Sequence, residues 1–550
     1  MNLLIKKIVD AETALKRIPD NAVVAVSGFN MAGTPDYLLR KLYELYEATG
    51  HPQNLFIVSD AIPAIPGKGL DFIAEKVYKD PDQKFLRGVL ISFFAFSPWL
   101  QKLALENRIE AYSWPLGVIA HWFRDIAAGR PGVITRVGLH TFNDPRMDEG
   151  YINDLAQKRK TCKVELINID GEEYLLYKGP KPTVALIRGT TADEIGNISM
   201  EREAIFGSVL PMAQAAKAQP NPGIVIAQVE RLAKFSSIHP KEVHVPGPLV
   251  DYVVIAPREY HWQSGTRDYD PTISGEIIPP LSAELISRLM PKIELNVEKV
   301  IARRVTLELV ELIKKLKRPL LINLGIGIPT IVNNVLAEEN ITEFVYTTVE
   351  SGDFGGIALQ DVDFGTAIGP FAIIPLPDQF TNYEGGIIDA ASLGFMEVDS
   401  EGNVNPSILP GRVSGPGGFP VIATGSPRIY FAGRFTAGKS NIKVVDGKLV
   451  IKDDGPIKKF VKRVNKILFN GKYAIKTNKE IYYITERAVF RLTKDGLVLQ
   501  EIAPGVDLEK DILSKMEFEP IIDPNLKEMD KRIFREEPMK LREELEEIFK

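Results

Sequence analysis

Short apolar runs, many of them rich in β-branched residues, recur along this chain of 550 residues, and amphipathic helical patterns separate them. The segment 36–46, for example, carries Leu38, Leu39, Leu42 and Leu45 on one helical face. Strands that alternate with helices form βα units, in which helices cover both faces of a largely parallel sheet. The sequence therefore predicts an α/β fold. The candidate strands are 22–26, 89–91, 184–187, 224–226, 253–255, 320–323, 344–349, 371–374 and 421–422.

The two halves of the chain repeat the same motifs in the same order. Residues 22–35 (AVVAVSGFNMAGTP) and 319–329 (PLLINLGIGIP) each read as a buried strand, a glycine turn and a proline that begins a helix. Residues 193–199 (DEIGNIS) and 399–405 (DSEGNVN) share a D-x-x-G-N turn. Chance similarity between βα turns is the alternative that such short matches leave open. We expect two related open α/β domains.

The proline-rich stretch 278–298 suggests where these domains meet. We expect an N-terminal domain over 1–285, a C-terminal domain over 298–520 and a helical tail over 521–550. Within the last hundred residues, Asn470-Gly471 fits a type I′ hairpin turn, and 480–500 alternates like strands.

Composition excludes several classes of protein. Lys and Arg number 67 against 72 Asp and Glu, so the chain lacks the positive excess typical of nucleic-acid binding. The most apolar run, 88–100, contains Pro98 and is shorter than the roughly 20 residues that a membrane span needs. One cysteine, Cys162, cannot form an intramolecular disulfide, which favours a reducing, cytoplasmic setting. We therefore expect neither nucleic acid nor membrane as a partner.

Residues 433–440 (GRFTAGKS) match the P-loop pattern letter for letter. A P-loop needs a helix that begins at its lysine, because the helix N-terminus holds the phosphates. The β-branched run 441–445 predicts a strand there instead, which argues against nucleotide binding. The six histidines are dispersed and no G-x-S-x-G elbow occurs, so neither a metal site nor a serine hydrolase is expected.

The segment 344–356 (FVYTTVESGDFGG) contains the most informative candidate for a catalytic residue. A predicted buried strand delivers Glu350 at its carboxyl end, where ligands bind in open α/β sheets. Glycines around the carboxylate let a bulky electrophile approach, and glutamate can act as a covalent nucleophile. A helix cap or a surface carboxylate is the alternative that the residues alone favour.

Together these segments and others along the chain make the sequence resemble the family I CoA-transferases, in the branch of fused-chain acetate/propionate and 3-oxoacid enzymes. The resemblance extends from residue 27 to about residue 513. It rests on these segments: 106–132 (ENRIEAYSWPLGVIAHWFRDIAAGRPG), 188–204 (RGTTADEIGNISMEREA), 245–251 (VPGPLVD), 323–329 (NLGIGIP), 349–356 (VESGDFGG), 383–405 (YEGGIIDAASLGFMEVDSEGNVN), 415–419 (GPGGF) and 431–438 (FAGRFTAG).

The resemblance implies two related α/β domains with the active site between them, and a ping-pong exchange of coenzyme A between an acyl-CoA and a free short-chain carboxylate. Glu350 matches the catalytic glutamate, which carries CoA as a covalent thioester. No permanently bound cofactor or metal is implied, and a homo-oligomer is expected. The residues expected around CoA are Asn323, Gly325, Ile326, Gly327, Asn403, Asn405, Gly417 and Gly418, and those expected near the acyl group or an oxyanion are Gly33, Leu116 and Gly355.

One residue departs from the family pattern. The motif is usually Pro-Gln-Gly, but residues 115–117 read Pro-Leu-Gly, so Leu116 replaces an amide donor near the acyl group. An apolar residue there favours longer or branched acyl chains. Leu116 also keeps open an acyl-CoA hydrolase on the same scaffold. A non-catalytic sensor of CoA thioesters or sugar phosphates is the alternative from another class, because related folds host such modules.

Overall fold

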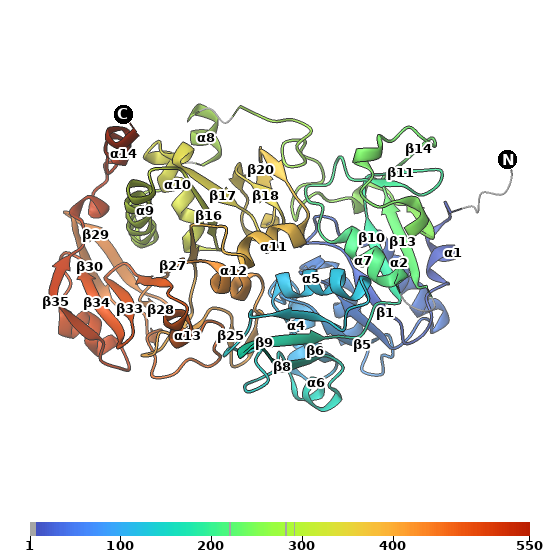
Figure 1. Ribbon diagram of the computed structural model, residues 1–550, viewed down its shortest axis with the longest axis horizontal. Helices are drawn as coiled ribbons and strands as arrows, with labels where there is room; N and C mark the ends of the chain where they lie inside the picture. The colour runs from blue at the N-terminus through green and yellow to red at the C-terminus, as the bar shows by residue number, and fades with distance from the viewer. Residues whose placement is uncertain (1–6, 219–221, 281–282, 291, 550) are drawn as a thin grey trace.

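Each half of the chain builds one central sheet, and the two halves lie side by side along the long axis of the molecule (Figure 1). The structure is a computed structural model that describes residues 7–218, 222–280, 283–290 and 292–549. The predicted α/β fold with two related domains is confirmed.

The N-terminal sheet has seven parallel strands. Its core strands, such as β1 (VVAV), are buried along their whole length, as expected where helices cover both faces. The strands in sheet order are β15 (Tyr252–Ile255), β13 (Ile224–Val229), β10 (Val184–Arg188), β1 (Val23–Val26), β2 (Leu55–Val58), β5 (Leu86–Leu90) and β6 (Glu110–Tyr112). The main helices are α1 (Ala11–Leu15), α2 (Asp36–Thr49), α3 (Leu70–Lys79), α4 (Pro98–Leu105), α5 (Leu116–Ala127), α6 (Asp154–Arg159) and α7 (Val209–Lys217).

The C-terminal sheet has ten strands and is parallel at its centre. In sheet order these are β21 (Ala372–Ile373), β18 (Asp353–Phe354), β17 (Val345–Thr348), β16 (Leu320–Leu324), β22 (Ala390–Leu393), β27 (Arg428–Ala432), β32 (Glu480–Ile484), β33 (Ala488–Thr493), β34 (Gly496–Ile502) and β35 (Ile521–Glu528). The helices are α8 (Ala283–Leu289), α9 (Val297–Leu316), α10 (Ile331–Glu338), α11 (Leu376–Glu384), α12 (Phe419–Gly425), α13 (Gly471–Lys476) and α14 (Leu541–Phe549).

The internal repeat is visible in strand order and in hydrogen bonds. The order β2-β1-β10-β13-β15 of the first sheet matches the order β17-β16-β22-β27-β32 of the second. Both D-x-x-G-N turns close in the same way. Asp193 accepts from the backbone and side chain of Asn197, and Asp399 does the same with Asn403. The similarity of the motifs is therefore structural rather than accidental.

Two predictions of single elements were wrong, and a third, for the C-terminal tail, was wrong in part. Residues 421–422 lie in α12 rather than in a strand, because a short apolar run fits either element and Pro420 favours a helix start. Asn470 caps α13 through the backbone N–H of Tyr473 instead of forming a hairpin turn.

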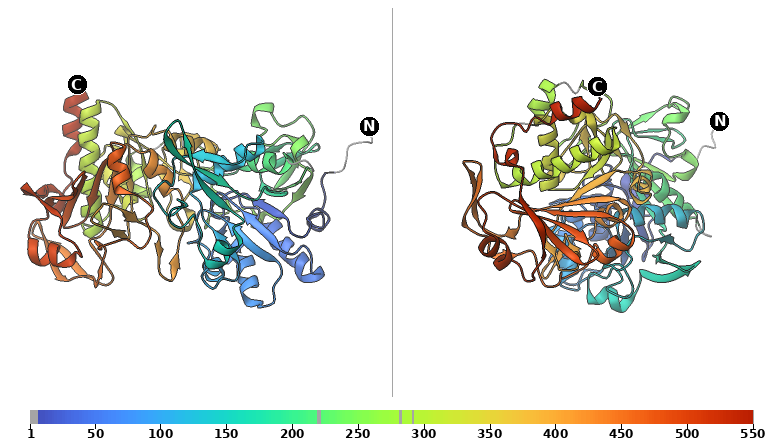
Figure 2. Two further views of the ribbon diagram at one scale, coloured as in Figure 1. Left: turned by 60° about the horizontal axis from the view of Figure 1, so that its bottom comes forward. Right: turned by 60° about the vertical axis from the view of Figure 1, so that its left-hand side comes forward.

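The C-terminal tail is also not all helix. Residues 521–528 form β35, which lies beside β34 at the edge of the sheet, where Pro524 costs no internal ladder bond. Only α14 is an α-helix in this tail among the described residues. It lies beside α9, with Lys314 Nζ 2.7 Å from Glu544 Oε2 (Figure 2).

The two halves meet along α5 and α11 (Figure 1). Arg124 on α5 donates to Asp378 on α11 at 2.7 Å. Asn30, in the turn after β1, donates to the carbonyl oxygen of Phe364 at 2.9 Å. The first contact joins a helix of each half, and the second holds the turn after β1 against a loop of the C-terminal half.

Candidate active site

Glu350 lies two residues beyond β17, in a loop that the neighbouring side chains hold in place. Asn323 donates to the carbonyl oxygen of Thr348 at 3.3 Å, and Gln379 donates to that of Val349 at 3.0 Å. Gly352 has φ +130°, and a Cβ there would lie 1.9 Å from the carbonyl oxygen of Ile374. The tight turn after the nucleophile candidate therefore requires glycine.

The carboxylate of Glu350 has no hydrogen-bond or ion-pair partner among the described residues. Burial without a compensating charge raises the pKa of Glu350 from its ordinary value to about 7. A Cβ placed on Gly418 would lie 2.4 Å from Oε2 of Glu350, so the carboxylate rests directly on the Cα of that glycine. An unpaired, desolvated carboxylate of this kind is a candidate nucleophile.

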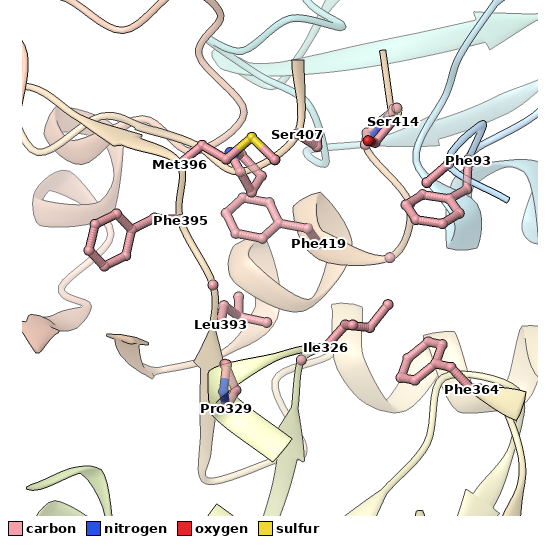
Figure 3. Close-up of a pocket in the computed structure, with 18 of the residues that line it drawn as sticks. Phe93, Ile326, Pro329, Phe364, Leu393, Phe395, Met396, Ser407, Ser414 and Phe419 are labelled. Carbon is pink, nitrogen blue, oxygen red and sulfur yellow. The ribbon is translucent and has the colours of Figure 1, made fainter. Parts of the chain in front are cut away.

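Glu350 is among the residues that line a cavity of about 680 Å³, to which both halves of the chain contribute. Figure 3 shows part of this lining, with Phe93 from the N-terminal half and Leu393 from the C-terminal half. From the N-terminal half come Phe29, Asn30, Ala61, Ile62, Phe93, Ala95, Phe96 and Leu116. From the C-terminal half come, among others, Gly325, Ile326, Pro329, Phe364, Leu393, Phe395, Met396, Arg412, residues 414–419, Arg434 and Lys459. The cavity thus sits at the junction between the domains.

Backbone amides near Glu350 differ in whether they are free to bind an oxyanion. The N–H of Gly417 already donates to Ser92 O at 2.8 Å, and that of Gly325 donates to Ser392 O at 2.8 Å. The N–H groups of Gly418 and Ile326 have no acceptor within the described part of the chain. Of the predicted amide donors that line the cavity, these two are the ones available to a ligand.

Several residues predicted for the site do not line the cavity, namely Gly33, Asn323, Gly327, Gly355, Asn403 and Asn405. Asn323 supports the loop of Glu350, as described above. Asn403 and Asn405 are buried, and their side-chain amides bond to the protein itself: Asn403 Oδ1 accepts from the backbone of Gly471, and Asn405 Nδ2 donates to Glu397. Glu350, Leu116, Gly325, Ile326, Gly417 and Gly418 do come together around the cavity.

Sequence reasoning missed the aromatic and cationic lining. Lys459 is a buried lysine whose ammonium lies 3.9 Å from the ring centroid of Phe395, and desolvation lowers its pKa to about 7. Arg434 belongs to the segment that mimics a P-loop, and β29 (Asn441–Val445) follows that segment as predicted, not a helix. The apolar strand end at Phe93 and the glycine-rich run around Arg434 were visible in the sequence, but nothing there placed them together.

Sequence and structure comparisons agree on the relatives of this chain. Residues 8–256 match the family described as coenzyme A transferase. The chain is 40% identical to the caffeate CoA-transferase of Acetobacterium woodii, over 96% of this chain and 98% of that protein. This chain belongs to the CoA-transferase family. It is therefore an enzyme that transfers coenzyme A.

Other relatives of this CoA-transferase have the same fused architecture. It is 38% identical to the acetate CoA-transferase YdiF of Escherichia coli K12, over 96% of this chain and 95% of that protein. A crystal structure of YdiF from E. coli O157:H7, as a thioester complex with CoA, superimposes with a TM-score of 0.85 at 36% identity and covers 97% of each chain.

Within the described residues, no group of three or more His, Cys, Asp or Glu side chains is placed to hold a metal ion. The helices of the described residues include none that is long and apolar enough to cross a membrane.

Proposed function

We propose that this CoA-transferase works by a ping-pong exchange in which Glu350 carries coenzyme A as a glutamyl thioester. The observation that carries the proposal is the unpaired carboxylate of Glu350, packed on Gly418 inside the interdomain cavity. The related YdiF structure, described as a thioester complex with CoA, supports the same chemistry.

The first half-reaction moves CoA onto the enzyme. A carboxylate oxygen of Glu350 attacks the thioester carbonyl, and the C–S bond breaks. CoA departs as its thiolate, and a mixed acyl-glutamyl anhydride remains on the enzyme. The thiolate then attacks the glutamyl carbonyl and expels the first acid as its carboxylate. The N–H groups of Gly418 and Ile326 are the proposed donors to the oxyanions.

The second half-reaction reverses these steps with another acid. Its carboxylate attacks the glutamyl thioester and releases CoA thiolate, which attacks the acyl carbonyl of the new anhydride. The new acyl-CoA leaves and the Glu350 carboxylate is restored. Thioester energy is conserved at each stage, so the balance needs no nucleotide.

The cavity carries basic side chains that suit the CoA moiety. Arg412, Arg434 and Lys459 line it, and the last has no hydrogen-bond partner for its ammonium among the described residues. Charged groups there are proposed to hold CoA phosphates or pantetheine carbonyls, and binding energy from these remote contacts supports the reaction at Glu350. The roles predicted for the other site residues remain proposals.

The test is mass spectrometry of the intact protein and its peptides after incubation with acetyl-CoA and no acceptor acid. A CoA-sized adduct on the peptide that contains Glu350, released by added acetate, is expected. Glu350→Gln should form no adduct, whereas Glu519→Gln, at an exposed glutamate outside the cavity, should form it normally.

Other outcomes identify the alternatives. CoA that accumulates without an adduct would favour the hydrolase, in which water resolves the intermediate. Binding of acetyl-CoA without adduct or turnover would favour the sensor.

We further propose that the protein is cytoplasmic, which the single buried thiol of Cys162 supports, and that it forms a homo-oligomer, which the family resemblance supports.

The identity of the acid is a separate question. The names of the two relatives specify acids of very different size, caffeate and acetate. We propose a monocarboxylate as acceptor and retain short-chain acids as the first ones to assay.

A further inference from the structure

We propose that the preferred acid of this enzyme has a bulky apolar body, aromatic or branched, and that the part of the cavity facing the N-terminal domain is its acyl site. This inference rests on the proposed function, because the acid in question is the one that becomes joined to Glu350.

Charge is distributed unevenly around the cavity. The eight lining residues of the N-terminal half are uncharged, and Asn30 is the one with a polar side chain. The cationic side chains among the described lining residues, Arg412, Arg434 and Lys459, all belong to the C-terminal half. The N-terminal wall of the cavity is therefore its apolar end, suited to the acyl group, whereas the C-terminal residues of the lining supply the basic side chains suited to CoA.

The apolar end lies directly beside the nucleophile. The backbone N–H of Leu116 donates to Gly417 O at 2.8 Å, and the next residue, Gly418, touches the Glu350 carboxylate. A Cβ on Gly417 would lie 3.6 Å from the ring of Phe93. An acyl group on Glu350 that extends toward the N-terminal half thus meets Leu116 and Phe93 first.

Aromatic rings from both domains continue this wall. Phe29 and Phe364 contact each other across the domain boundary, with ring centroids 5.9 Å apart. Phe93 and Phe96 pack edge to face at 5.6 Å. Phe93 and Phe364 lie on the right of Figure 3 and face the same open region, whereas Phe395 and Met396 lie on the left. Tilted and edge-on rings of this kind favour an aromatic guest.

The same wall disfavours small and doubly charged acids. Acetate would leave most of the apolar surface without contacts. A dicarboxylate such as succinate would bring its second charge against the N-terminal wall around Leu116 and Phe93, whose own lining residues carry no charge to pair with it. The expected order of acceptors is therefore an aromatic monocarboxylate, then acetate, then succinate.

The experiment measures kcat/KM for three acceptors, 3-phenylpropanoate, acetate and succinate, with propionyl-CoA as donor. We expect 3-phenylpropanoate to exceed acetate by about tenfold or more, and succinate to be the poorest of the three. Phe93→Ala should lower the ratio of 3-phenylpropanoate to acetate by about tenfold. The matched control is Phe235→Ala, at an exposed phenylalanine that does not line the cavity, and it should leave the ratio unchanged.

The outcomes separate this inference from the proposed mechanism. Acetate or succinate used as well as 3-phenylpropanoate, with the Glu350 adduct still formed, would overturn the acyl-site inference alone. Failure to form the adduct with any donor would overturn the mechanism instead. If Phe93→Ala does not fold, the acceptor order of the unmodified enzyme still decides the question.

Discussion

Oε2 of Glu350 lies so close to Gly418 that a Cβ on this glycine would approach that oxygen to 2.4 Å, and any larger residue would displace the carboxylate. Gly418 has φ −79°, a conformation that any residue adopts, so its backbone angles do not explain the glycine. The reason is proximity, because the peptide at 418 lies against the carboxylate, as the oxyanion role proposed for its N–H requires.

Gly418→Ala should therefore damage catalysis more than stability. The added methyl group would displace the Glu350 carboxylate, and we expect kcat to fall about 10–100-fold, with a melting temperature within a few degrees of the parent. Gly171→Ala is the control, because Gly171 has φ +87° and no neighbour within 4 Å. That variant should lose a little stability and no activity. Equal kcat for Gly418→Ala and the parent would refute the close contact.

The pKa of Glu350 predicts the pH dependence of the first half-reaction. In the proposed mechanism only the ionised carboxylate attacks the thioester, and burial raises the pKa of Glu350 to about 7. We expect kcat/KM for acyl-CoA to fall about tenfold per pH unit below that value and to level off above it. Rates measured between pH 5.5 and 8.5 at saturating acceptor acid would test this, and a flat profile down to pH 5.5 would contradict it.

The same shift predicts that Glu350 destabilises the fold at alkaline pH. Its folded pKa lies above its unfolded value, so its contribution to stability is present below pH 4.5 and is lost as the pH rises through about 7. At pH 8, Glu350→Gln should raise the free energy of unfolding by about 1–3 kcal/mol relative to the parent, and at pH 5 by much less. Urea unfolding at the two pH values measures the difference, which would be absent if the carboxylate were paired.

The fold could be predicted from the sequence because its signals are local and repeated. Buried runs such as 184–187 and 320–323 became strands, and the leucines of 36–46 became the buried face of α2. Errors arose where a short sequence pattern was compatible with two kinds of secondary structure. The run at 421–422 fits a strand or a buried helix, and Asn470 suits a hairpin or a helix cap, so tertiary packing decided both.

The site was predictable only where one residue carries the chemistry. Glu350 and the glycines at 417 and 418 sit in compact motifs, whereas Phe29 and Phe364 are far apart in the chain and meet only because the domains pack together. Lys459 gave no signal at all, since its pKa and its position depend on the burial that folding provides.

The repeat offers a test of the role predicted for Asn403. In the structure its amide bonds to Asp399 and to the backbone of Gly471, just as Asn197 in the N-terminal repeat bonds to Asp193 and to the backbone of Gly247.

Asn403→Ala and Asn197→Ala should therefore behave alike. Each removes a side chain that closes a turn, buried at Asn403 and partly buried at Asn197. Each should lower the free energy of unfolding by about 1–3 kcal/mol while leaving the KM for acyl-CoA within about twofold. Denaturant unfolding and steady-state kinetics on both variants make the comparison. A rise in KM for Asn403→Ala alone would show that this asparagine contacts CoA, as the family resemblance implies, and that the turn opens when the substrate binds.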